Sequence, residues 1–237
     1  MTVGLPAKME NRILSLLPRD ERERLQPRLE PVSLEVKQVL FEPGQRIEHV
    51  YFPISGVISV LAAIDNGHVE VATVGSEGLV GFRALLDADT AHAAVLVQVP
   101  GQALRMRTDD LKKEFKRGSG LKPLVNRYVN AFITQLAQSA ACNAFHSIEK
   151  RFCRWLLMTH DRVRSDQFPL THELLAQMLG VRRASVTQVA SKVQRAGLIR
   201  YTHGKIAVVD RPGLEAASCA CYRAVRDDYE ALLGEPR

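Results

Sequence analysis

The sequence predicts an α+β protein with an antiparallel β domain, a long connecting helix and a smaller helical domain at the carboxyl end. Short runs rich in β-branched residues alternate with turn sequences between residues 32 and 106. A segment with apolar residues at helical spacing follows, from residue 121 to about residue 146. Beyond it, two short helical patterns flank a corner at Gly180. The 237 residues, 46% of them hydrophobic, suffice for two ordinary cores.

The amino-terminal half is predicted to contain two short helices followed by strands. Ile13, Leu14, Leu16 and Leu17 supply the apolar side of the first helix. We expect strands at residues 32–36, 39–41, 50–52, 57–64, 69–74, 93–99 and 103–106. Asn66-Gly67 is the clearest hairpin turn, because it tolerates positive φ angles. Many short antiparallel strands at this spacing predict a barrel, roll or sandwich.

A long amphipathic helix is predicted from residue 121 to about residue 146. Such a helix between two domains buries its apolar stripe against the β domain, against a partner's copy of itself, or both. Gln135 and Ser139 interrupt the coiled-coil spacing that part of it shows. We expect a homodimer whose contacts are made by Leu121, Leu124, Val125, Tyr128, Val129, Phe132 and Leu136.

The carboxyl-terminal third is predicted to form a winged helix-turn-helix. Ser147 is expected to cap a helix over residues 148–160, in which Trp155 is interpreted as a core residue. Thr171 is placed to cap a second helix that ends at Gly180, and a third helix follows over residues 182–196. The runs at residues 198–201 and 206–209 flank a hairpin tip and predict the wing.

Positive charge is concentrated in this segment. The chain has a net charge of +6, and seven basic residues oppose only Glu173 and Asp210 between residues 171 and 211. Acids here would repel phosphates and reduce counterion release. We therefore expect double-stranded DNA as the partner, with Arg183, Thr187 and Gln188 contacting bases. The expected phosphate contacts are Thr171, Arg182, Ser185, Lys192, His203 and Lys205. The alternative is a basic surface that binds no nucleic acid.

The four cysteines, Cys142, Cys153, Cys219 and Cys221, match neither a zinc ribbon nor a secreted disulfide framework. We expect reduced structural thiols and no metal site, because an isolated Cys219-x-Cys221 pair supplies too few ligands for a closed site. The helix expected beyond Gly213 receives no role. No secretory signal and no apolar stretch of membrane length is present, so a cytoplasmic location and no membrane contact are predicted.

The chain resembles the Crp/Fnr superfamily of bacterial transcription regulators. The matching stretches are Phe41-Glu42-Pro43-Gly44 and residues 50–57, 150–157 and 175–180, within a resemblance over roughly residues 10 to 212. It implies a β-roll sensor domain of the cyclic-nucleotide-binding type at residues 1–117, a dimerisation helix at 118–146 and a winged-helix DNA-binding domain with a helical extension at 147–237. It also implies a homodimer on a palindromic operator, RNA polymerase as a further partner, and no enzymatic activity.

The resemblance breaks down at the effector pocket. Nucleotide-binding members hold the ribose and cyclic phosphate with a Gly-Glu pair and, about ten residues later, an Arg-Ser or Arg-Thr pair, because a buried phosphate needs charged partners. Gly81-Phe82 and His92-Ala93 occupy these positions here, and Arg83 lies next to the missing acid. We expect a degenerate pocket, no cofactor, and no gating by cyclic AMP or cyclic GMP.

Two alternatives belong to other classes. His68 and Glu70 alternate on one strand and, with His49 or His92, could form the metal site of a cupin-like β domain that carries an appended DNA-binding domain. The other is an architectural DNA binder without a switch.

Overall fold

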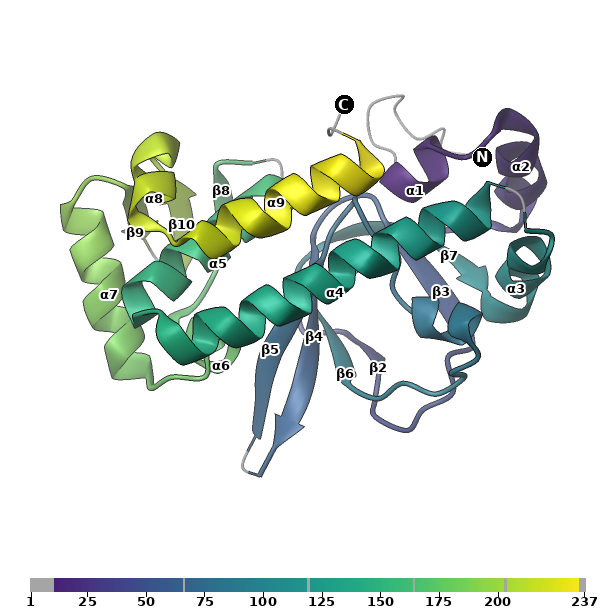
Figure 1. The fold of residues 1–237 in the computed structure, drawn as a ribbon. Coiled ribbons are helices and arrows are strands. Elements are labelled where there is room, and N and C mark those ends of the chain that lie inside the picture. Colours follow the sequence, from purple (N-terminus) through teal and green to yellow (C-terminus); the bar gives the residue numbers. More distant parts are fainter. Residues whose placement is uncertain (1–10, 66, 119, 164, 203, 235–237) are drawn as a thin grey trace.

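The structure is a computed structural model of the 237-residue chain and describes residues 11–65, 67–118, 120–163, 165–202 and 204–234. The strands lie in two segments, residues 30–107 and 167–208, and long helices separate these segments, as the α+β prediction required. Figure 1 shows the β domain near the N-terminal helices, a small helical domain at the other end, and the long helix α4 crossing between them.

The amino-terminal helices are tied to the β domain by one buried side chain. The predicted helices are present as α1 (Arg12–Ser15) and α2 (Arg19–Leu25), followed by the turn η1 (Gln26–Arg28). Asn11 caps α1 by accepting hydrogen bonds from the amides of Ile13 and Leu14. Its own amide group donates to the carbonyl oxygens of Pro53 and Gly78, at 3.0 and 2.7 Å. Asn11 therefore caps a helix and anchors it to the end of a strand and to a loop of the β domain.

The β domain contains two antiparallel sheets, with strand orders β1-β7-β3 and β2-β6-β4-β5. Its strands are β1 (Glu30–Leu34), β2 (Val39–Phe41), β3 (His49–Pro53), β4 (Val57–Ile64), β5 (Gly67–Val74), β6 (Ala94–Val99) and β7 (Gly101–Arg107). Each predicted strand is present, with ends that differ by a few residues. The predicted β4–β5 hairpin pairs Ile64 with Gly67, and Asn66 lies outside the described residues. The turn η2 (Phe82–Leu86) lies between β5 and β6, and α3 (Thr108–Lys116) follows β7.

The helix α4 (Leu121–Phe145) has one buried and one exposed face. Leu121, Leu124, Val125, Tyr128 and Phe132 are buried inside the same chain, where they join the core of the β domain. Val129 and Leu136 are partly buried against that core. The stripe predicted to form the dimer contact is therefore occupied by intramolecular packing. The five buried residues are therefore not exposed to a partner within this chain, and the dimer contact itself stays a prediction.

The carboxyl-terminal domain contains the predicted helices and wing. Its elements are α5 (Ile148–Val163), β8 (Gln167–Pro169), α6 (His172–Leu179), α7 (Arg183–Arg195), β9 (Ile199–Thr202), β10 (Lys205–Val208) and α8 (Arg211–Ala217). The strands form a small sheet in the order β8-β10-β9. The prediction missed β8, because its three residues follow a polar turn and carry little β signal.

The last helix, α9 (Ala220–Leu233), runs alongside α4 back towards α1, as Figure 1 shows. Tyr229 of α9 lies against Tyr128 of α4, with ring centroids 6.3 Å apart. Near its end, the Leu233 carbonyl accepts a hydrogen bond from Arg12 Nε at 2.9 Å. The C-terminal extension is thus packed along the molecule. Across the described ranges, no helix combines the length and apolar character needed to span a bilayer.

Candidate nucleic-acid interface and sensor pocket

The corner between α6 and α7 follows from three local interactions. Thr171 Oγ1 accepts a hydrogen bond from the Leu174 amide at 3.1 Å and so caps α6. Gly180 ends α6 at φ 62°, in the left-handed region that glycine adopts with little strain. Arg182 has an extended backbone and is the N-cap of α7, so the helix begins at Arg183, one residue later than predicted.

The predicted base-reading residues share the exposed side of α7. Arg183, Thr187 and Gln188 are exposed, whereas Val186 and Val193 are buried beneath them. Arg183 and Thr187 are four residues apart and therefore lie above one another on one face. Arg182 is also exposed at the start of the helix, and Ser185 is half-buried. The structure thus brings the three residues together at the amino-terminal end of α7.

One contact in this region was missed by the sequence analysis. The His172 ring stacks on Tyr201 of the wing, with centroids 4.5 Å apart and planes inclined by 28°. Its Nδ1 is 3.0 Å from Thr187 Oγ1. The Thr187 hydroxyl also donates a hydrogen bond of 3.1 Å to the carbonyl oxygen of Arg183. His172 therefore joins α6, α7 and β9. Partial burial, and secondarily the charge of Arg183, lower its pKa, which favours a neutral ring.

The predicted phosphate contacts are in different states. Lys192 Nζ is 2.6 Å from Glu149 Oε2 of α5, so its charge is already paired. The expectation of an acid-free surface is therefore wrong at this point, because Glu149 reaches the segment from another helix. Lys205 is exposed at the start of β10, while Thr171 uses its hydroxyl oxygen for the cap. His203 lies outside the described residues.

The five residues of the degenerate effector pocket line one cavity of about 50 Å³ in the β domain. This volume holds only a few water molecules, since one water needs about 10 to 15 Å³ on the same scale. Apart from Arg83 and His92, the walls are apolar: Phe41, Ile47, Val60, Val74, Leu79, Val80, Gly81, Phe82, Ala91, Ala93, Val95 and Phe132. The structure therefore brings the five positions together around one cavity, and their role as an effector pocket stays a prediction.

Aromatic packing closes this cavity on the side of α4. The Phe82 ring meets Tyr128 and Phe132 edge-on, at centroid distances of 5.6 and 5.2 Å. In the described part of the chain, Arg83 has no ion-pair partner, and its buried Nε has no hydrogen-bond acceptor. Burial, and secondarily the charge of Arg83, lower the pKa of His92. The wall thus offers one unpaired guanidinium and no carboxylate.

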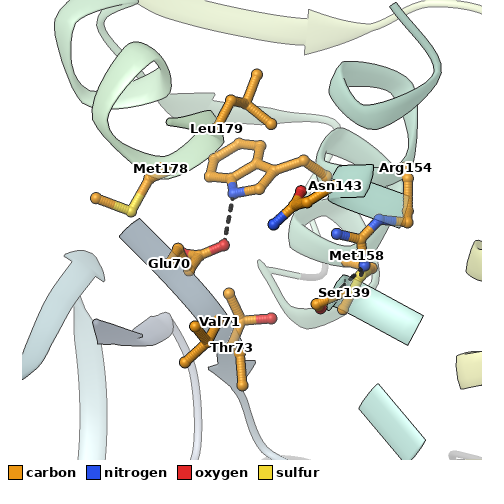
Figure 2. A pocket seen from close by; sticks show the side chains of 11 residues that line it. Glu70, Val71, Thr73, Ser139, Asn143, Arg154, Met158, Met178 and Leu179 are labelled. Carbon is orange, nitrogen blue, oxygen red and sulfur yellow. Dashed lines mark hydrogen bonds between the residues drawn. The ribbon is translucent and has the colours of Figure 1, made fainter. Parts of the chain in front are cut away.

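A second, smaller cavity lies between the β domain and the DNA-binding domain (Figure 2). Glu70 of β5 accepts hydrogen bonds from the Trp155 indole N–H at 2.8 Å and from the Ser59 hydroxyl at 2.6 Å. Burial raises the pKa of Glu70 to about 7, although these two donors lower it. Among the described residues, neither His68 nor Glu70 belongs to a group of three metal-ligating side chains. The structure therefore gives no support to the cupin-like alternative.

A buried ion pair connects the same two domains. Arg162 Nε of α5 donates to Glu77 Oε1 at 2.8 Å, and Arg162 Nη2 donates to Gln135 Oε1 of α4 at 3.1 Å. Both members are largely buried. A Cβ added at Gly75 would lie 2.5 Å from Arg162 Cγ, so the arginine occupies space that only glycine leaves free. The domains are thus held together by two charged side chains with specific partners.

The Cys219-x-Cys221 pair is not isolated in the structure, which corrects the premise on which a metal site was dismissed. Cys142 and His146 from the end of α4 lie beside it, and the four ligand atoms are within 4.8 Å of one another. Burial raises the pKa of the Cys142 thiol to about 12 and also raises that of Cys221. The cluster was missed because its halves are separated by more than 70 residues of sequence.

An exposed basic helix beside a wing, joined by a long helix to a separate β domain, is typical of a two-domain DNA-binding transcriptional regulator. The profile of the Crp-like helix-turn-helix domain matches residues 150–217, and that of the cyclic nucleotide-binding domain matches residues 31–117. The chain belongs to the Crp/Fnr family of DNA-binding transcriptional regulators. The predicted family, fold class and absence of enzymatic function agree with this assignment.

Relatives and solved structures of this family are similar over most of the chain. The global nitrogen regulator of Synechocystis sp. is 23% identical over 184 residues, which cover 72% of this chain and 80% of that protein. A Crp/Fnr-family regulator from Eubacterium rectale has a TM-score of 0.66 at 15% identity, covering 85% and 94% of the two chains. The c-di-GMP-responsive regulator CLP of Xanthomonas campestris has a TM-score of 0.59 at 21% identity, covering 81% and 99%.

Proposed function

We propose that this regulator recognises a specific operator through the amino-terminal end of α7. The observation that carries the proposal is the joint exposure of Arg183, Thr187 and Gln188 on one side of that helix. The start of the second helix is the part of a helix-turn-helix that reaches base edges in the major groove. Lys205 on the neighbouring wing supplies a charge for the phosphate backbone.

The three side chains have different roles in this proposal. The Arg183 guanidinium pairs with the O6 and N7 atoms of guanine, and the Gln188 amide pairs with adenine. The Thr187 hydroxyl is already bonded within the protein, so its methyl group is the part that faces a thymine methyl. His172 positions Thr187 and the wing relative to α7. Arg182 and Ser185 contact phosphates.

We propose that the DNA-bound form is a homodimer that uses the exposed face of α4. Positions 126, 130, 133, 137, 140 and 144 alternate spacings of four and three residues, as a coiled-coil seam does. They carry Asn126, Asn130, Ile133, Ala137, Ala140 and Ala144, all exposed. Ile133 is 55% exposed, and the alanines allow two helix backbones to approach closely. In this proposal, the exposed seam takes the place of the buried stripe that the sequence predicts as the dimer contact. Contact with RNA polymerase is a separate prediction.

We propose that cyclic nucleotides do not gate this regulator. Phe82 stands at the position of the ribose-binding acid and packs into the cavity wall, where it meets Tyr128 and Phe132. The small cavity would have to expand to admit a nucleotide, and Arg83 is the one guanidinium in its wall. Expanding a packed aromatic wall costs contacts that a single ion pair does not replace.

Selection of bound fragments from random duplex oligonucleotides tests the proposed function. We expect an enriched palindromic site with half-sites about one helical turn apart. Arg183→Ala should weaken binding to that site by about 1 to 3 kcal/mol and relax its preference at one base pair. Lys205→Ala should weaken specific and non-specific duplexes alike. Fragments without a shared motif would indicate an architectural DNA binder, and an unchanged preference in Arg183→Ala would refute the proposed docking.

A further inference from the structure

Four metal-ligating side chains converge where the C-terminal helix α9 meets the end of α4. Cys142 lies in the last turn of α4 and His146 is the C-cap of that helix, while Cys219 and Cys221 come from the start of α9. The three cysteines are buried and form a cluster separate from the main hydrophobic core, and His146 is half-buried. Cys219, Cys221 and α9 lie beyond the segments that match the two family profiles.

The distances within this cluster suit tetrahedral coordination. Cys142 Sγ and Cys219 Sγ are 3.5 Å apart, and Cys221 Sγ is 3.6 Å from His146 Nδ1. A tetrahedral zinc ion with Zn–S bonds of about 2.3 Å and a Zn–N bond of about 2.1 Å separates two sulfurs by about 3.8 Å and sulfur from nitrogen by about 3.6 Å. The widest separation, within 4.8 Å, therefore closes by about 1 Å of side-chain adjustment.

The local sequence explains why the four donors face one another. Cys142 and His146 are four residues apart, so they lie on one side of α4. Cys219 is the N-cap of α9, and Cys221 lies in its first turn. Thiolates at a helix amino terminus are favoured by the helix dipole.

A disulfide explains this arrangement less well. The closest sulfurs are 3.5 Å apart, whereas a disulfide holds them at about 2.05 Å. One disulfide would also use two of the four donors and leave the third sulfur and the imidazole without a function. Four protein donors with no place left for substrate are typical of structural zinc sites.

We propose that Cys142, His146, Cys219 and Cys221 bind one zinc ion, which fastens the start of α9 to the α4–α5 junction. Only His146, which has an extended backbone, and Ser147 separate α4 from α5. The metal therefore joins α4 to α9 at the connection to the DNA-binding domain. The proposal does not depend on which DNA sequence the protein reads.

The metal content of the purified full-length chain tests this proposal directly. We expect about one zinc per chain by elemental analysis, retained against a weak chromophoric chelator and released by a thiol-modifying mercurial. The Co²⁺-substituted protein should show the intense visible bands of tetrahedral thiolate coordination. Cys153→Ala is the matched control, because Cys153 is buried outside the cluster, and it should keep the metal.

Thermal unfolding gives a second readout that does not require a fully stable variant. Removal of zinc with a strong chelator should lower the Tm of the wild-type chain by about 5 °C or more. The same treatment should leave the Tm of Cys219→Ser/Cys221→Ser unchanged, whatever its starting value. A chain that is purified without metal, and whose Tm changes neither with added zinc nor with chelator, would overturn the proposal. A Cys142–Cys219 disulfide found by mass spectrometry would overturn it as well.

Discussion

The indole N–H of Trp155 donates a hydrogen bond of 2.8 Å to Glu70 and so connects α5 of the DNA-binding domain to β5 of the β-roll. The same carboxyl group accepts a bond from Ser59, and its pKa of about 7 lies near neutral pH. Both protonation states of Glu70 are therefore populated under ordinary conditions. We therefore expect the junction between the β domain and the DNA-binding domain to respond to pH.

Glu70 should give the protein a stability that decreases as pH rises. Its pKa is higher in the folded chain than the value of 4.5 of a free side chain, so the folded state binds more protons between pH 4.5 and about 7. Its contribution of about 3 kcal/mol is present in full below pH 4.5 and is lost as pH rises through 7. Trp155 is the single tryptophan, so its fluorescence should titrate with a midpoint near 7. The transition should be absent in Glu70→Gln, and an unchanged midpoint there would exclude Glu70 as its source.

Arg162 and Glu77 should contribute strongly to stability because removal of one leaves the other buried without its partner. We expect Arg162→Met to lower the free energy of unfolding by about 3 to 5 kcal/mol in urea titrations. The exposed pair of Arg19 and Glu23 is a suitable control, and Arg19→Ala should change stability by less than about 1 kcal/mol. Similar losses in both variants would contradict the buried character of the inner pair.

Glu149 should weaken DNA binding because it neutralises Lys192. Glu149→Gln is expected to raise affinity for duplex DNA and to steepen its dependence on the logarithm of salt concentration by up to about 0.9, the contribution of one phosphate contact. The double variant Glu149→Gln/Lys192→Ala should lose this gain. Fluorescence anisotropy over a series of salt concentrations measures both quantities. If the gain in affinity persists in the double variant, it comes from removal of the Glu149 charge alone and not from the release of Lys192.

Two adjacent residues of α4 should separate dimerisation from folding. If the proposed dimer forms, Ile133→Asp should convert it to a monomer in sedimentation equilibrium, with little change in stability, because the side chain is exposed within one chain. Phe132→Ala should lower stability by about 3 to 5 kcal/mol but leave the association state unchanged, because Phe132 is buried inside the protomer. A monomer in Phe132→Ala, together with an unchanged association state in Ile133→Asp, would place the interface on the α4 stripe that the sequence predicts.

Cyclic nucleotides should not stabilise the chain. At millimolar cyclic AMP or cyclic GMP, we expect no measurable change in Tm, because the cavity lacks the acid and the second donor pair that a cyclic phosphate requires. A rise of several degrees would show that Arg83 alone replaces them. In that case Arg83→Ala should abolish the shift while Gly81 and the cavity wall stay intact.

Local sequence patterns were sufficient for most elements, but not for the contacts between them. The stripe on α4 was read correctly as one helical face, yet periodicity states only which residues share a face and not which neighbour covers it. For the same reason, the pairing of Glu149 with Lys192 was missed, as were the stacking of His172 on Tyr201 and the cluster that joins Cys142 to Cys219. A family pattern fixed the spacing of the residues that line the cavity, whereas no such pattern covered α9.

The course of α9 has a mechanical consequence. Its first turn is held at the α4–α5 junction, its middle touches Tyr128, and its last turn is hydrogen-bonded to Arg12. Tyr128 is also in ring contact with Phe82 at the cavity. We therefore expect a rotation of the DNA-binding domain about His146 to displace α9, because α9 contacts the chain at both of its ends. The cavity of the β domain is connected to α9 through the rings of Phe82 and Tyr128, a chain of contacts that does not include α5.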